Sequence, residues 1–183
     1  NLRLKIHTRF NDGLNLNKIG LQRYDYSKKN LFYSSFKSMY RANESDANYL
    51  LYDGWETQKF NNTATLGWSH FYKYKNGNGV ISLELTSSSI GSDYDYSKAT
   101  FTSIHKNKIG KLRFNTRFYA QYGTGNNWAS ESQLYLAGAN PEELMENKFT
   151  ASKGFIPTEW VKYGETTNKF HSGGGLNLRG YAG

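Results

Sequence analysis

Hydrophobic and polar residues alternate with a period of two along two long stretches of the chain. In residues 2–10, Leu2, Leu4, Ile6, Thr8 and Phe10 would lie on one face, and Arg3, Lys5, His7 and Arg9 on the other. Residues 111–122 repeat the pattern, with Leu112, Phe114, Thr116, Phe118, Ala120 and Tyr122 opposite Lys111, Arg113, Asn115, Arg117, Tyr119 and Gln121. This alternation is typical of β-strands with one apolar and one solvated face.

A third strand is predicted near 63–75, with Ala64, Leu66, Trp68, Tyr72 and Tyr74 on one side, interrupted by His70. Four further stretches alternate less cleanly but are rich in Tyr, Phe, Ile, Thr and Ser, and we predict them as strands: roughly 14–27, 31–42, 79–91 and 96–106. Short polar segments separate the strands: Asn11-Asp12-Gly13, Ser27-Lys28-Lys29-Asn30, Asn76-Gly77-Asn78-Gly79 and Asn107-Lys108. The spacing predicts an all-β fold, an antiparallel up-and-down meander of about seven strands over 1–123.

One five-residue sequence occurs twice, as Tyr24-Asp25-Tyr26-Ser27-Lys28 and as Tyr94-Asp95-Tyr96-Ser97-Lys98. The two copies begin 70 residues apart (94 − 24). Duplication of a hairpin would explain the pair, but low sequence complexity explains it more simply. It carries little weight as a repeat.

Composition excludes several classes of protein. Hydrophobic residues make up 37% of the 183 residues, the mean hydropathy is −0.76, and no apolar run approaches the roughly 18 residues of a transmembrane helix. The chain has no cysteine, which excludes disulfides and thiolate metal sites. Aromatic residues reach 16%, with 18 Gly and 2 Pro, which is a β composition rather than a disordered or helical one.

The predicted strands are about 10–14 residues long, against a usual length of five or six. Roughly 9–11 tilted residues cross a bilayer, and weakly alternating strands with a polar lumen are typical of outer-membrane barrels. A polar lumen would also account for the low hydropathy. A soluble lipocalin-like barrel or sandwich with one wet face is the alternative that periodicity leaves open.

Residues 124–183 lose the alternation and end in Gly173-Gly174-Gly175-Leu176-Asn177-Leu178-Arg179-Gly180-Tyr181. The glycine cluster followed by Leu178-Arg179-Gly180-Tyr181 resembles the (V/L)-R-G-(F/Y) signature of the BamA-like superfamily. These outer-membrane barrels insert membrane proteins, secrete partner proteins or anchor fused enzymes. Residues 133–139 resemble the opening of the stretch that leads to the motif, although an insert of about 35 residues separates them from Arg179. Within the superfamily, the segment is most similar to Bacteroidota barrels fused behind metallopeptidase-like domains.

The resemblance implies how the chain is organised. In the family the motif lies at the tip of the sixth extracellular loop, which folds back into the lumen, where acidic wall groups hold its arginine. We therefore expect a partial barrel over 1–123 and a long extracellular loop over 124–183, with Arg179 as an internal strut, Gly180 in the tight backbone and Tyr181 against the wall. Both ends of the chain look internal to a longer protein, which would supply the remaining strands.

Basic residues concentrate on the polar side of the two most regular strands. Arg3, Lys5, Arg9, Arg113 and Arg117 are the candidate lumen-facing residues. In a lumen they would attract a polypeptide, a polar solute or a plugging loop; in a soluble sheet they would be a solvated face. Because the aromatic residues fall largely on the opposite side, no base-stacking platform accompanies the positive charge, and we do not predict nucleic-acid binding.

No nucleophile motif, phosphate loop or metal-ligand spacing occurs, so we predict no catalytic residue, cofactor or metal in this segment. Our hypothesis is a segment of an outer-membrane β-barrel of the protein-insertion or secretion type, in the bacterial outer membrane. Its expected partners are the lipid bilayer, the remaining strands of its own barrel, and client polypeptides or a periplasmic or surface protein. A barrel that anchors a fused hydrolase, metallopeptidase-like or lipase-like, is the first alternative, and a soluble β-barrel binding module is the second.

Overall fold

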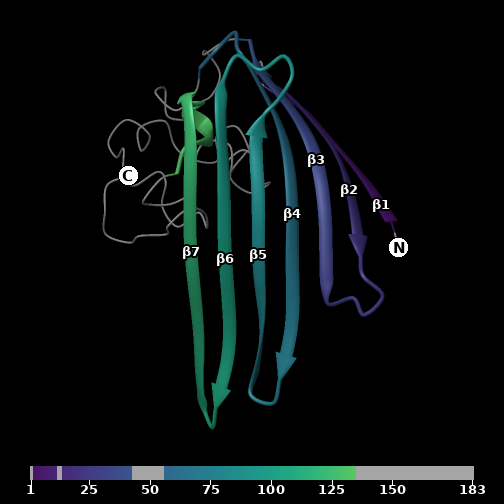
Figure 1. The fold of residues 1–183 in the computed structure, drawn as a ribbon, viewed down its shortest axis with the longest axis vertical. Helices are drawn as coiled ribbons and strands as arrows, with labels where there is room; N and C mark the ends of the chain where they lie inside the picture. The colour runs from purple at the N-terminus through teal and green to yellow at the C-terminus, as the bar shows by residue number, and fades with distance from the viewer. Residues whose placement is uncertain (1, 12–13, 43–55, 135–183) are drawn as a thin grey trace. The chain divides into compact units, whose positions relative to one another are not determined.

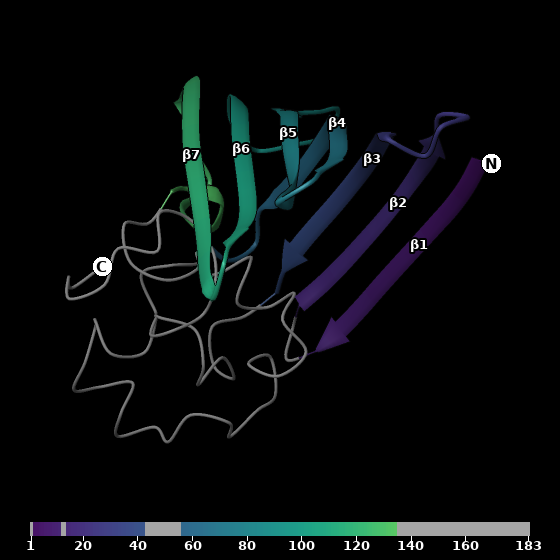
Figure 2. The same ribbon diagram turned by 90° about the horizontal axis from the view of Figure 1, so that it is seen from below.

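The computed structural model describes residues 2–11, 14–42 and 56–134. They form one antiparallel sheet of seven strands in sequence order (Figures 1 and 2). The strands are β1 (Leu2–Asn11), β2 (Leu14–Tyr24), β3 (Asn30–Arg41), β4 (Phe60–Tyr74), β5 (Gly77–Ser88), β6 (Asp95–Ile109) and β7 (Leu112–Asn127). The predicted all-β up-and-down meander is thus confirmed. Among the described strands β1 does not pair with β7, so these seven strands do not form a closed barrel.

The register of β4 to β7 keeps residues of like polarity on the same face. Leu66 lies opposite Leu85, Leu85 opposite Ala99, and Ala99 opposite Tyr122. Directly opposed residues of antiparallel strands project to the same side, so this row runs across all four strands. A single register shift, at Asp95 and Tyr96, leaves the rest of the four-stranded ladder regular.

Two predicted turns were placed wrongly. The β4–β5 turn consists of Lys75 and Asn76, and both Gly77 and Gly79 belong to β5. The β6–β7 turn is at Gly110, which has a positive φ of 61°, whereas Asn107 and Lys108 continue β6. The prediction was wrong because glycine and asparagine, which are common in turns, also occur inside these strands. There Gly77 and Gly79 lie under tyrosine rings, and Asn107 bonds to a tyrosine hydroxyl.

The last strand is longer than the sequence indicated. β7 continues to Asn127 instead of ending near 123, and a short 3₁₀ turn at Ser130–Ser132 follows it. Across the described ranges, no helix is long and apolar enough to span a membrane. Of the segment 124–183 that was expected as a loop, residues 124–127 belong to β7, and the described residues 128–134 contain no strand.

The chain divides into two compact units. The first contains residues 1–9, 15–39 and 60–127, and therefore nearly all of the sheet. The second contains residues 10–14, 40–59 and 128–183, of which only part is described. Within it, the Gln58 backbone N–H donates to the Arg41 carbonyl at 2.6 Å, and Lys59 forms an ion pair with Glu56.

The β2–β3 turn is closed by the Asp25 carboxylate. One carboxylate oxygen accepts from the Asn30 backbone N–H at 3.1 Å; the other accepts from the Asn30 side chain at 2.7 Å and from the Ser27 hydroxyl at 2.8 Å. The hydrogen bonds from Asn30, followed by that from Ser27, lower the pKa of Asp25 from 3.8 to about 2. The ionised form therefore stabilises the turn.

We expect acid to loosen this turn. A carboxylate with a lowered pKa in the folded state contributes stability that is complete above its unfolded pKa near 3.8, and that is lost as the pH falls through about 2. Hydrogen exchange of the Asn30 amide, corrected for intrinsic rate, should become faster between pH 4 and pH 2. In Asp25→Asn the protection should be lower at pH 4 and independent of pH over this window; equal pH dependence in both proteins would contradict the assignment.

Candidate membrane-facing surface

Large hydrophobic side chains cover one side of the sheet and remain exposed. We call this side the apolar face. Exposed fractions include 59% for Leu4, 62% for Leu66, 49% for Leu85, 61% for Phe118 and 75% for Tyr122. The apolar residues expected on one face of the strands at 2–10 and 111–122 lie here. Isolated exposed hydrophobic residues are common in soluble proteins, but a contiguous patch that extends over all seven strands marks an interaction surface.

The apolar rows on β4–β7 form a band of limited height. Its central rows contain Leu66, Trp68, His70, Ile81, Leu83, Leu85, Ala99, Phe101, Ser103, Phe118, Ala120 and Tyr122. The row Ala64, Ser87, Ser97 and Thr124 bounds it at one end, and the row Tyr72, Gly79, His105 and Thr116 bounds it at the other. Between Ala64 and Tyr72 the chain rises about 27 Å, at about 3.4 Å per residue. A tilt of about 40° reduces this to about 20 Å, a few ångströms less than the roughly 25 Å apolar band of outer-membrane barrels.

An aromatic column on β4 runs from the middle of this band past its lower edge. The rings of Trp68, His70, Tyr72 and Tyr74 stack at centroid distances of 6.1, 6.0 and 6.1 Å. Their polar atoms are bound: Trp68 Nε1 donates to Asn30 Oδ1 at 3.2 Å, and His70 Nδ1 lies 2.8 Å from the same oxygen. Aromatic side chains with a polar tip favour the boundary between apolar and aqueous phases, where both ends are satisfied.

Three tyrosines in the sheet each reach across a glycine to a polar residue one strand further away. Tyr72 covers Gly79 and bonds to His105; Tyr74 covers Gly77 and bonds to Asn107. On the opposite side of the sheet, Tyr33 covers Gly67 and donates to Glu84 Oε2 at 2.7 Å.

These contacts explain why glycines occur within the strands. A Cβ at position 67 would lie 1.9 Å from Cζ of Tyr33, and one at position 79 would lie 2.5 Å from Cζ of Tyr72. The glycines therefore provide room for a ring. In each case one tyrosine side chain thereby links three adjacent strands.

The opposite side of the sheet, the polar face, carries nearly all the strand charges. Its lysines and arginines are Arg3, Lys5, Arg9, Lys18, Lys37, Arg41, Lys73, Lys98, Lys106, Lys108, Arg113 and Arg117. In the described strands, Glu84 is the carboxylate on this face. Arg3 lies 6.0 Å from the ring centre of Tyr24, and Arg117 lies 4.8 Å from that of Tyr119. Such stacking holds a guanidinium along the sheet surface.

The predicted site residues have different outcomes. Arg3, Lys5 and Arg9 lie on the polar face of β1, and Arg113 and Arg117 on that of β7. β1 and β7 are the two edge strands, so the sheet does not pair these two basic groups with each other. The motif residues Leu178, Arg179, Gly180 and Tyr181, with Gly173, Gly174 and Gly175, lie outside the described residues.

The sequence predicted Trp68, Tyr72 and Tyr74 on one side of a strand but indicated His70 only as an interruption of that side. In the structure His70 stacks between Trp68 and Tyr72 and joins the aromatic column. Its spacing of two from both neighbours was the available signal. Within the described ranges, no group of three His, Asp or Glu side chains gathers in a metal-binding arrangement.

No known protein family, curated protein or solved structure matches this chain.

Proposed function

We propose that this chain is part of the wall of an outer-membrane β-barrel, with the apolar face in contact with lipid and the polar face towards the lumen. The observation that carries the proposal is the exposed apolar face, which is continuous over seven long antiparallel strands and backed by a strongly basic face. In a bilayer such a face is stabilised by the hydrocarbon around it, and its band of about 20 Å covers most of the roughly 25 Å apolar band of such barrels.

The two free edges of the sheet indicate that these seven strands would form only part of the barrel wall. In the seven-stranded order, β1 and β7 each pair with one neighbour. An unpaired backbone edge is not viable in lipid, because no water is present to bond its N–H and C=O groups. Further strands, from the same protein or from another chain, would have to complete the barrel.

The Leu178-Arg179-Gly180-Tyr181 motif is what favours a barrel of the protein-insertion or secretion type. It follows the last strand of the sheet, as the loop motif of the BamA-like superfamily follows its barrel strands. The basic polar face would suit a lumen that holds a loop or a polypeptide. This finer assignment rests on the resemblance.

Single-cysteine labelling tests which phase each face contacts. The chain has no cysteine, so a spin label can be placed at one position at a time. Leu83 and Leu85 lie on the apolar face, and Thr100 and Thr102 lie on the polar face of the neighbouring strand. In the liposome-reconstituted full-length protein, we expect labels at 83 and 85 to collide more with dissolved oxygen than with a water-soluble nickel chelate.

Labels at 100 and 102 are the matched controls, because they lie at the same height on the other face. Their ratio of oxygen to nickel collisions should be several-fold lower. Equal ratios at all four positions would refute the membrane orientation. A protein that stays in the aqueous fraction during reconstitution would instead support the soluble binding module.

A further inference from the structure

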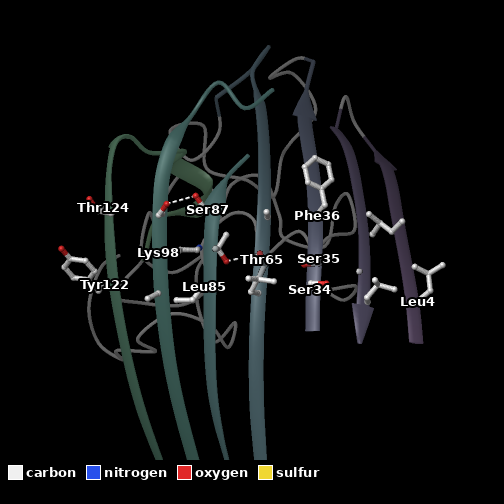
Figure 3. A pocket seen from close by; sticks show the side chains of 18 residues that line it. Leu4, Ser34, Ser35, Phe36, Thr65, Leu85, Ser87, Lys98, Tyr122 and Thr124 are labelled. Atoms are coloured by element: carbon white, nitrogen blue, oxygen red, sulfur yellow. Dashed lines mark hydrogen bonds between the residues drawn. The ribbon is translucent and has the colours of Figure 1, made fainter. Parts of the chain in front are cut away.

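The apolar face is not flat but contains two adjoining hollows. The larger, of about 800 Å³, is lined from β1 to β7 and extends from Leu4 to Tyr122 (Figure 3). The smaller, of about 500 Å³, lies towards the β2–β3 turn. Both are lined by Leu21, Ser34, Leu66 and Leu85, so they form one groove. Their volumes are typical of sites for small molecules with a large apolar part.

The charged side chain that the apolar face brings to the groove is Arg23, which lines the smaller hollow. Lys98 borders the larger hollow from a strand position that projects to the polar face, and no carboxylate occurs among the described residues that line either hollow. Arg23 is the one basic residue that the described strands place on the apolar face, at the end of β2. The nearby Asp25 carboxylate accepts hydrogen bonds from its own turn, from Asn30 and Ser27.

Arg23 also lies at the level expected for lipid headgroups. It is the last residue but one of β2, next to the polar β2–β3 turn, and it lines the same hollow as Phe32 and Trp68. A guanidinium at this level can extend to the interface and form paired hydrogen bonds with a phosphate. The aliphatic stretch from Leu21 to Leu85 continues from it into the band.

We infer that the groove is a binding site for one anionic phospholipid. An acyl chain would lie along Leu21, Leu66 and Leu85, and the headgroup phosphate would accept hydrogen bonds from Arg23 beside Trp68. The inference rests on the proposed function, because it places the apolar face in a bilayer. It goes further by naming the position and the charge of a bound lipid.

The test is native mass spectrometry of the full-length protein released from detergent micelles. The probes are a phosphatidylglycerol and a phosphatidylcholine with the same acyl chains. We expect the protein to retain phosphatidylglycerol about fivefold more than phosphatidylcholine, as one arginine near an anionic headgroup supplies. Arg23→Gln should reduce this ratio to about one, whereas Arg113→Gln, which removes an exposed charge from the polar face, should preserve it.

A second variant tests the apolar part of the site. Ser34 lines both hollows, so Ser34→Phe should fill the groove and reduce retention of both lipids. Circular dichroism verifies that each variant keeps its β-structure. An unchanged lipid ratio in Arg23→Gln, or equal retention of both lipids by the unmodified protein, would overturn the inference. If the spin labels still report a lipid-facing surface, the failure concerns this site and not the proposed membrane wall.

Discussion

Replacing Gly67 with alanine will destabilise the sheet by about 3 kcal/mol, the upper end of what an added methyl group costs at a well-packed site. The new Cβ would lie 1.9 Å from Cζ of Tyr33 and 2.4 Å from both adjacent ring carbons. β3 and β4 cannot separate without breaking the hydrogen bonds between them, so the Tyr33 ring must leave its position. Tyr33 would then lose its contact with the strand and its 2.7 Å hydrogen bond to Glu84.

A double-mutant cycle isolates this contact. In the background of Tyr33→Ala the ring is absent, and Gly67→Ala should then cost less than about 1 kcal/mol, because alanine is otherwise better than glycine inside a strand. Urea unfolding of the detergent-folded protein, followed by tryptophan fluorescence, measures the four free energies of unfolding. Equal costs of Gly67→Ala in the two backgrounds would show that Tyr33 does not occupy this space.

Leu85→Arg will destabilise the bilayer-embedded protein by about 2–4 kcal/mol, if the apolar face lies in hydrocarbon. Leu85 is half exposed, and in water a charged substitution at such a surface position normally changes stability by no more than about 0.5 kcal/mol. Lipid cannot solvate a guanidinium, so the same position becomes costly there. The size of the effect therefore reports the phase that surrounds the side chain.

Gln121→Arg provides the matched control. Gln121 directly precedes Tyr122, which lies in the same row as Leu85, but Gln121 projects to the polar face. It should accept the charge at a cost below about 1 kcal/mol. Unfolding free energies in liposomes of fixed composition measure both variants. A cost for Leu85→Arg no larger than that for Gln121→Arg would contradict a lipid-facing surface.

Two stretches of identical sequence adopt different structures, so local sequence alone does not determine their conformation. In the first, Tyr24-Asp25-Tyr26-Ser27-Lys28 forms the β2–β3 turn, where Tyr26 is fully exposed and Lys28 has a positive φ. In the second, Tyr94 directly precedes β6 and the other four residues begin it; there Tyr96 is 2% exposed and its hydroxyl donates to Asn61 Oδ1 at 3.0 Å. The residues permit both conformations, and the tertiary surroundings select one.

The order and the polarity of the strands could be predicted because a strand exposes alternate residues to two different environments. The runs at 2–10 and 111–122 specify their apolar and basic faces without reference to any neighbour. The short polar segments between strands predict that the chain reverses direction there. They do not predict the exact residues of each turn.

The sequence by itself therefore determined the all-β meander and which residues share a face. Only the tertiary structure decided the register, the turn positions and the groove. Gly67, Gly77 and Gly79 accept tyrosine rings from neighbouring strands, a role that depends on which residues lie opposite them. Arg23 and Trp68 line one hollow for the same reason, because residues 45 positions apart (68 − 23) are brought to it only when β2, β3 and β4 lie side by side in the sheet. Periodicity is local and survives in one strand, whereas a site assembled across strands exists only once they are paired.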